Sequence, residues 1–159
     1  MNIVDIYKKS KNLSHIKKVI AIGLLLFWIV FIWHNSMEVA DISGMRSMRI
    51  TEAVNGILWN GKTVITEHGI RKLAHFFEYA VEGILTVLVF HVFKLSCFRD
   101  WSVGMLLGVM TALTDETIQL FSAGRDGSVG DVWIDFVGFA MGFLISALWV
   151  CCTSKKNSI

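Results

Sequence analysis

Proline is absent from this 159-residue sequence, and charged residues make up only 18% of it. Without proline, nothing in the sequence demands a kinked or broken helix, so plain helices are expected. The formal net charge of +2 is too small to indicate a nucleic-acid-binding protein, and the basic residues lie at segment ends instead of forming a stripe. The three cysteines are interpreted as small apolar packing residues, not as a metal or redox site.

Apolar residues are abundant instead: 54% of the residues are hydrophobic and the mean hydropathy is +0.58, which exceeds what a soluble domain usually carries. A bilayer-spanning helix needs about 20 apolar residues, and four of them would leave no room for a separate soluble domain. We therefore predict one all-α membrane domain over residues 1–159, a polytopic bundle of four transmembrane helices. The predicted spans cover residues 19–37, 73–93, 101–123 and 132–152.

A polar stretch, residues 38–71, separates the first two predicted spans. Within it, Ile50, Ala53, Val54 and Ile57 recur at helical spacing, which predicts a short extracytoplasmic helix lying in the membrane interface.

The basic residues predict the orientation. Four spans bring both termini to one side, and positively charged residues favour the cytoplasmic side of a membrane. The predicted cytoplasmic set outnumbers the basic residues of the opposite side. It comprises Lys8, Lys9, Lys11, Lys17, Lys18, Lys94, Arg99, Lys155 and Lys156. We accordingly predict a multi-pass protein with both termini in the cytoplasm.

Polar and ionisable residues interrupt the last three predicted spans at their extracytoplasmic ends. In residues 71–82 they fall on one helical face of roughly 100°, because their spacing follows 3.6 residues per turn. The same argument gives a polar face to each of the next two spans. The candidate ligand-binding residues are Arg71, Lys72, His75, Glu78, Tyr79, Glu82, Asp115, Glu116, Gln119, Arg125, Asp131 and Asp135.

Charges are costly inside a bilayer, at about 2.5–3.5 kcal/mol each on insertion scales, so such a set normally faces the bundle interior and carries function. A satisfied network of ion pairs that holds the helices together is the alternative. The set contains six acids against three fixed cations. That excess indicates that protonation, a metal or a cationic ligand supplies the missing charge.

Three ordered motifs carry a family resemblance: Arg71-Lys72-Leu73-Ala74-His75-Phe76-Phe77-Glu78-Tyr79, then residues 115–121 (DETIQLF), then Gly124-Arg125 with Asp131, Asp135 and Gly138. The chain resembles the VanZ-like family over roughly residues 19–150. This resemblance implies a bacterial plasma-membrane protein linked to the cell envelope, and its founding member is associated with resistance to the lipoglycopeptide teicoplanin. It implies no reaction.

Three hypotheses follow for the polar set. In the first, it binds a lipid-linked envelope precursor, an envelope lipid or a lipoglycopeptide without turning it over. In the second, an enzyme uses His75, Glu78, Asp115 or Glu116 as general acid or base on a lipid-linked substrate. No cofactor is predicted, but a metal-dependent variant would use the same four residues as ligands of a divalent ion.

In the third hypothesis, Glu78 and Glu82 form a protonatable pair in a proton-coupled transporter of lipid or solute. Four spans make a thin transporter, so this reading requires a homo-oligomer. The expected partners are thus the bilayer and an envelope component. Whether a second copy of the chain also binds, to form a homo-oligomer, is left open by the sequence.

Overall fold

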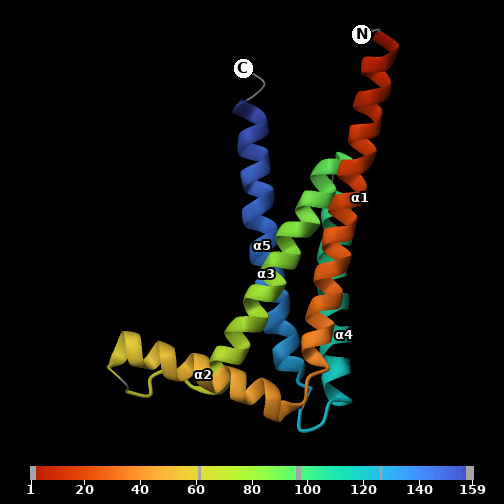
Figure 1. The fold of residues 1–159 in the computed structure, drawn as a ribbon. Helices are drawn as coiled ribbons and strands as arrows, with labels where there is room; N and C mark the ends of the chain where they lie inside the picture. The colour runs from red at the N-terminus through yellow and green to blue at the C-terminus, as the bar shows by residue number, and fades with distance from the viewer. Residues whose placement is uncertain (1–2, 61, 96–97, 126, 157–159) are drawn as a thin grey trace.

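The computed structural model describes residues 3–60, 62–95, 98–125 and 127–156, in which the chain forms five α-helices and no strand. This confirms the all-α prediction. Figure 1 shows that the helix of residues Ala40–Trp59 lies across one end of the other helices. The helices are α1 (Ile3–Ser36), α2 (Ala40–Trp59), α3 (Glu67–Phe93), α4 (Phe98–Leu120) and α5 (Val129–Lys156).

In the described part of the chain, three helices and not the predicted four are long and apolar enough to cross a membrane. They cover Leu13–Ser36, Glu67–Phe93 and Val129–Thr153, with mean hydropathies of 2.2, 1.6 and 2.0. The predicted segment 101–123 is helical up to Leu120, where α4 ends, but this helix falls outside the group. Asp115, Glu116 and Gln119, with nearby threonines, interrupt its apolar residues within the last two turns.

Two helices, α3 and α5, form the most closely packed pair. A Cβ added at Gly138 would collide with the carbonyl oxygen of Phe76, and one at Gly142 with the carbonyl oxygen of Ala80. The Gly-x-x-x-Gly spacing in α5 thus lets the two backbones touch, as such motifs do in membrane helices. Because Gly138 lies one turn after Asp135, this contact also brings Asp135 to α3.

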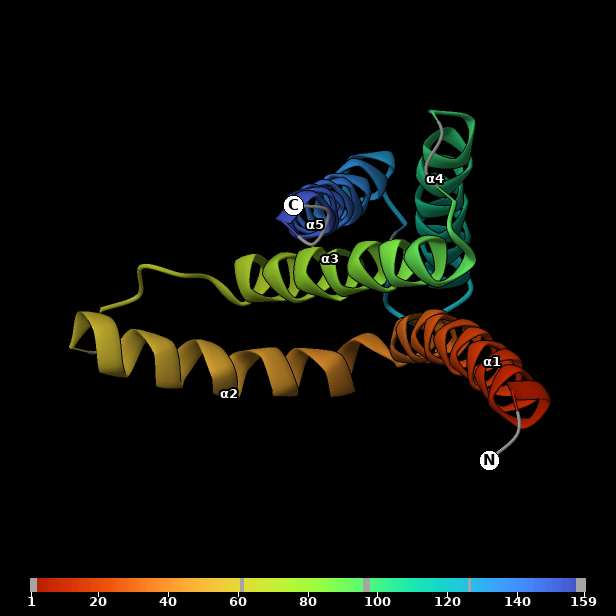
Figure 2. The same ribbon diagram turned by 90° about the horizontal axis from the view of Figure 1, so that it is seen from above.

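The helix α2 confirms the prediction of a helix between the first two spans, although it is 20 residues long and not short. Figure 2 shows α3 between α2 and α5. The face that α2 turns inward is polar, because its buried residues are Ser43, Ser47, Thr51 and Asn55. The apolar residues Ile50 and Ile57 point outward, which is the arrangement that an interfacial helix requires.

One side chain fastens the turn between α2 and α3. Asn55 Oδ1 accepts hydrogen bonds from the backbone N–H groups of Val64 and Ile65, at 3.1 Å each. Its amide donates to the Ile65 carbonyl at 2.9 Å. Thr66 then caps α3 by accepting a hydrogen bond from the Gly69 N–H at 3.2 Å. The start of α3 is therefore fixed against α2.

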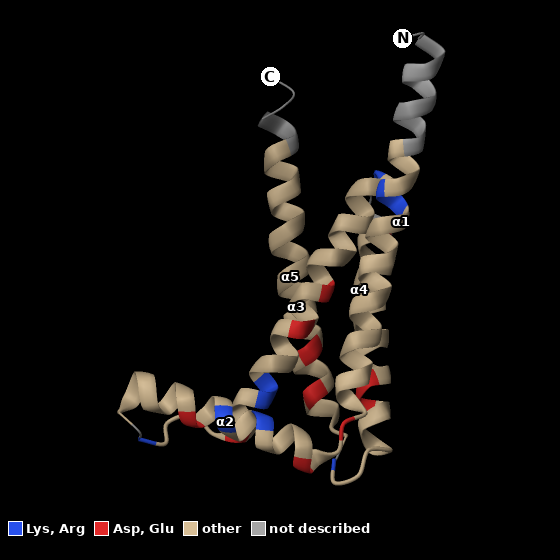
Figure 3. Cartoon of the chain, viewed as in Figure 1, with Lys and Arg blue, Asp and Glu red and all other residues tan. Residues whose placement is uncertain are grey.

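Charge is distributed unevenly along the bundle. Figure 3 shows Asp and Glu concentrated toward the end that α2 crosses, with basic residues of α1 toward the other end, where α1 begins and α5 ends. Lys18 Nζ lies 5.0 Å from the ring centre of Phe93, so the end of α3 is at that end as well. The predicted cytoplasmic side chains of Lys8, Lys9, Lys11, Arg99, Lys155 and Lys156 lie outside the described residues.

Candidate functional site

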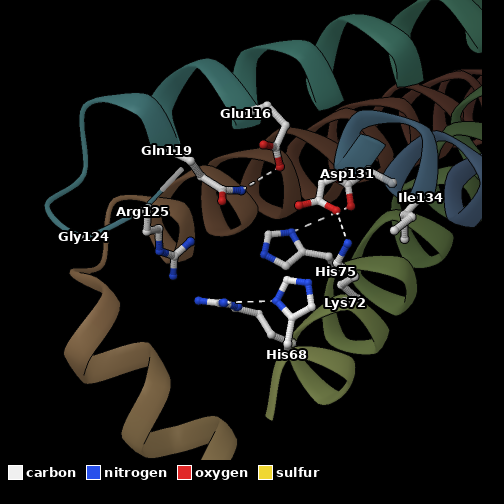
Figure 4. A pocket seen from close by; sticks show the side chains of 11 residues that line it. His68, Lys72, His75, Glu116, Gln119, Gly124, Arg125, Asp131 and Ile134 are labelled. Atoms are coloured by element: carbon white, nitrogen blue, oxygen red, sulfur yellow. Dashed lines mark hydrogen bonds and ion pairs between the residues drawn. The ribbon is translucent and has the colours of Figure 1, made fainter. Parts of the chain in front are cut away.

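A cavity of about 310 Å³ opens at the end of the bundle that α2 crosses, among α3, α4, α5 and the loop between the last two (Figure 4). The helical spacing on α3 and the close contact of α3 with α5 turn the polar faces of these helices toward the same space. The cavity is lined by His68, Arg71, Lys72, His75, Glu116, Gln119, Gly124, Arg125, Asp131, Ile134 and Asp135.

Basic side chains form one part of the cavity wall, which we call the cationic rim: His68, Arg71, Lys72 and Arg125. Lys72 Nζ pairs with Asp131 Oδ1 of α5 at 2.6 Å, so its charge is balanced. Arg71 Nη2 lies 3.4 Å from His68 Nδ1. The Arg125 side chain extends from the loop toward the cavity in Figure 4.

Arg125 is the least satisfied member of the cationic rim. Its Nη2 makes one long hydrogen bond of 3.4 Å to the Asn35 carbonyl, while Nε and Nη1 are buried with no hydrogen-bond partner. Burial lowers the pKa of this guanidinium, and the positive charge of Arg71 lowers it further. An anion between the two arginines would supply the missing acceptors.

Next to the cationic rim, His75, Asp115 and Asp135 from three different helices form a cluster that we call the acidic floor; His75 and Asp135 line the cavity, and Asp115 lies behind them. His75 Nδ1 is 3.6 Å from Asp115 Oδ2 and 3.8 Å from Asp135 Oδ1. Both carboxylates are buried, at 0% and 1% exposure. The floor therefore holds two acids around one imidazole.

Gln119 organises the α4 side of the cavity. Its amide donates to Asp115 Oδ2 at 3.1 Å and to Glu116 Oε1 at 3.0 Å, which joins two acids of its own helix. Glu116 Oε2 also accepts a hydrogen bond of 2.7 Å from the Ser128 N–H, at the start of α5. Gln119 thus holds the acids in position within α4, and these bonds do not bridge two helices.

Glu78 lies apart from the main cavity. It lines a smaller cavity of about 100 Å³ that α2 covers, together with Arg71, His75 and Arg125, which line both. Its Oε1 accepts a hydrogen bond of 3.0 Å from Asn35 of α1. The Glu78 carboxyl is therefore bound by Asn35 and lies in the smaller cavity, and His75 lies between it and the main cavity.

Tyr79 and Glu82 lie deeper and line neither cavity. Both are fully buried. Thr111 of α4 donates to Glu82 Oε1 at 2.9 Å, and the Thr111 carbonyl accepts a hydrogen bond of 3.4 Å from Tyr79. These two residues of the candidate set link α3 to α4 and do not reach the candidate site.

Sequence reasoning missed His68, Gly124 and Ile134 in the cavity wall. His68 precedes Lys72 by four residues and His75 by seven, which is one face of a helix. That signal was available, but the residues before 71 were taken as a polar connection, whereas α3 begins at Glu67. Gly124 and Ile134 carry no chemical signal that distinguishes them from turn and packing residues.

The alternative of a satisfied ion-pair network fits only part of the set. Among the described residues, Lys72 with Asp131 is the pair that a fixed cation forms within it. Arg125 does not pair with Asp135, and Arg71 does not pair with Glu78. Asp135 Oδ2 and Glu82 Oε2 are buried with no hydrogen-bond partner. The excess of acids seen in the sequence persists in the fold.

Comparison with models of protein families gives a match to the VanZ/LLP1 model over residues 19–150, which confirms the resemblance carried by the three motifs. The matched range begins within α1 and ends within α5, so it includes both cavities. Searches of curated proteins and of solved structures gave no match.

Proposed function

This chain belongs to the VanZ/LLP1 family, and on that premise we propose that it is a bacterial plasma-membrane protein that binds an envelope component through an anionic group. The ligand class is an anionic envelope lipid, a lipid-linked precursor or a lipoglycopeptide such as teicoplanin, held at the cationic rim without turnover. Binding of this kind would lower susceptibility to a lipoglycopeptide by shielding its target or the drug itself.

The unsatisfied guanidinium of Arg125 carries this proposal. A buried donor without a partner costs about 1–3 kcal/mol, and more when it is charged. An arginine fork matches the geometry of phosphate and carboxylate oxygens, so an anionic ligand would remove that cost at Arg125. Arg71 and His68 are close enough along the rim to contribute further donors.

The size of the cavity and its surroundings favour a ligand with an acyl or polyprenyl chain. About 310 Å³ accommodates a headgroup and not a whole lipid. Large apolar side chains, among them Phe77, Trp133 and Val137, are exposed on α3 and α5 and would face lipid tails. A chain-bearing ligand could therefore insert its anionic group in the cavity while its tail stays in the bilayer.

We propose that both termini face the cytoplasm and that the cavity opens on the extracytoplasmic side. Lys17, Lys18 and Lys94 lie at the end with the termini, which the positive-inside rule assigns to the cytoplasm. Envelope precursors and glycopeptides are encountered on the opposite face. Cysteine labelling of Ser14→Cys and Thr63→Cys in intact cells tests this: only the second should react with a membrane-impermeant maleimide.

Binding is tested with the purified full-length chain in nanodiscs of phosphatidylcholine, titrated with a fluorescent polyprenyl phosphate in the presence of EDTA. Arg125→Ala should weaken binding by about tenfold or more, since a charge-assisted hydrogen bond contributes about 1.5–3 kcal/mol. Arg49→Ala is the matched control, because Arg49 is exposed on α2 outside the cavity. Equal affinities for Arg125→Ala, Arg49→Ala and the unchanged chain would refute the proposed role of the cationic rim.

A second candidate function is acid-base or metal-dependent hydrolysis of a lipid-linked substrate. The observation in its favour is His75 between Asp115 and Asp135, since an imidazole oriented by carboxylates is a common general base. Turnover of a polyprenyl-linked phosphate, lost in His75→Gln but kept in His91→Gln, would select this function over binding alone.

A further inference from the structure

Three side chains of the acidic floor converge on one point from three helices. His75 of α3, Asp115 of α4 and Asp135 of α5 each offer one donor atom, and these atoms lie within 4.8 Å of one another. The His75 Nδ1 distances to the two nearest carboxylate oxygens are 3.6 Å and 3.8 Å. These contacts are too long for hydrogen bonds, so direct bonding between the side chains does not explain their convergence.

The spacing matches what a bound ion requires. Ligand atoms about 2.0–2.2 Å from a tetrahedral metal lie roughly 3.3–3.6 Å apart, close to the distances between His75 Nδ1 and the two aspartates. A hydrogen-bonded triad would bring the same atoms to about 2.7–3.2 Å. The distance from His75 Nδ1 to each aspartate is thus close to the distance between two ligand atoms of one metal ion.

Unpartnered atoms at the same point are the second observation. His75 Nδ1 and Asp135 Oδ2 are buried without a hydrogen-bond partner, and Asp135 is 1% exposed. A buried carboxylate with neither a hydrogen bond nor a Lys or Arg partner is expensive. The described lysines and arginines of the cavity do not pair with Asp115 or Asp135, so a bound cation would balance the charge of these two acids.

Neighbouring groups fix the positions of Asp115 and Asp135, as they do for the side chains that ligate metals in proteins. The amide of Gln119 donates to Asp115 Oδ2, an outer hydrogen bond of the kind that orients ligating carboxylates. Gly138 permits the backbone contact that holds Asp135 beside His75, since a Cβ there would collide with the Phe76 carbonyl. Both supports are built into rigid helices, and not into loops.

We propose that His75, Asp115 and Asp135 form a binding site for one divalent transition-metal ion, of the Zn²⁺ or Mn²⁺ class. One imidazole with two carboxylates suits these ions better than Mg²⁺ or Ca²⁺, which favour oxygen ligands alone. The ligand set differs from the four residues named by the sequence, because Asp135 takes the place of Glu78 and Glu116. Glu78 is bound by Asn35, and Glu116 by Gln119 and Ser128.

The site has an open side. His75 and Asp135 both line the cavity, so a fourth ligand position faces the cationic rim. Water or an oxygen of an anionic ligand would complete the coordination there, as in three-ligand zinc sites. The metal assignment depends on the three side chains and does not require the proposed anionic ligand to exist.

Metal content is the direct test. The full-length chain is purified in detergent, stripped with EDTA, equilibrated with Zn²⁺ or Mn²⁺ without added lipid, desalted and analysed by mass spectrometry. We expect one equivalent of metal per chain, with Mg²⁺ and Ca²⁺ unable to compete at tenfold excess. Asp135→Asn and His75→Gln should each lower the metal affinity by about 100-fold or more, since even outer-shell changes cost 10–100-fold.

Matched controls keep the result specific. Asp41→Asn removes an exposed acid of α2, and His91→Gln removes a histidine near the opposite end of α3, so both variants should bind metal as the unchanged chain does. Uptake of less than a tenth of an equivalent by the unchanged chain would overturn the site. Metal that all four variants retain equally would do so as well.

A spectroscopic measurement covers the case in which a variant does not fold. Mn²⁺ bound to the unchanged chain should show one imidazole ¹⁴N coupling in pulsed electron paramagnetic resonance, because one histidine is a ligand. A spectrum with no nitrogen coupling would overturn the assignment. Failure here leaves the lipid titration in EDTA unaffected, and failure of that titration leaves metal uptake unaffected, so the two proposals are judged separately.

Discussion

The α3–α5 pair encloses a cavity toward each end, and the two cavities differ in almost every physical property. The one near α2 is lined by charged and amide side chains around His75. The one toward the termini, about 580 Å³, is lined mainly by apolar side chains such as Phe90, Trp101 and Phe143. The same two helices thus present charged side chains to a cavity at one end and apolar side chains to a cavity at the other. The expected effects of substitution differ accordingly.

The largest effect is expected at Gly142, between the two ends. Gly142→Leu would force α5 away from the Ala80 carbonyl, disrupt both cavities, and lower the free energy of unfolding by about 3 kcal/mol or more. Thermal unfolding in detergent measures it. Gly23→Leu is the control, because a Cβ at Gly23 meets nothing within 4 Å. Equal stability of the two variants would mean that α3 and α5 do not pack at this glycine.

Phe143→Ala tests whether the apolar end of the α3–α5 pair is independent of the polar end. Phe143 is fully buried and packs edge-on against Phe90 and Trp101, with ring centres 5.9 Å and 6.1 Å apart. Its loss should lower stability by about 3 kcal/mol while leaving lipid-phosphate and metal affinity unchanged. Phe77→Ala, at a 63% exposed ring of α3, should cost much less. A matching loss of metal affinity in Phe143→Ala would show that the ends are not independent.

Thr111→Val tests the hydrogen bond between Thr111 and Glu82, which lies between the polar end and the apolar end. The substitution removes the hydrogen bond to Glu82 Oε1 and leaves a second buried carboxyl oxygen without a partner, for a loss of about 1–3 kcal/mol. Urea unfolding in mixed micelles measures the difference. Thr117→Val on the same helix is the matched control, because the Thr117 hydroxyl is exposed and donates only to the Leu113 carbonyl of its own helix. A gain of stability in Thr111→Val would contradict the hydrogen-bonded arrangement of Glu82.

The smallest effect is expected for the ion pair at the cavity mouth. The Lys72 and Asp131 side chains are 36% and 27% exposed, and such pairs contribute about 0–1 kcal/mol. A double-mutant cycle of Lys72→Met and Asp131→Asn should therefore give a coupling energy below about 1 kcal/mol that falls with added salt. A salt-independent coupling above about 2 kcal/mol would mean that this pair is buried in the bilayer-embedded protein.

The sequence was sufficient to identify the polar faces but not their depth. Spacing on a helix fixes an angle around its axis, and from it His75, Asp115 and Asp135 were predicted to lie on converging faces. One ligand atom of each lies within 4.8 Å of the others in the structure. It does not fix how far each residue lies along the bundle relative to its neighbours. That depends on where the backbones touch, which Gly138 and Gly142 decide, and it explains why Tyr79 and Glu82 lie below the cavity.

The helix α2 was predicted as an interfacial helix from its apolar positions, but the residues that pack against the rest of the protein were not predicted. These buried residues are Ser43, Ser47, Thr51 and Asn55. In a water-soluble protein the apolar face turns inward, but a helix at a membrane surface can turn its apolar residues to lipid and its small polar residues to the protein. The exposed Ile57, at 81%, fits this arrangement. Composition alone could not decide between the two.

The Asn55 hydrogen bonds make the bend between α2 and α3 a stiff elbow, with the first turn of α3 immediately beyond it. His68 and Arg71 lie on that turn and the next. A tilt of α2 would therefore move the cationic rim with it, because these hydrogen bonds transmit a rotation that a loose loop would absorb. The position of α2 and the width of the cavity mouth are thus coupled.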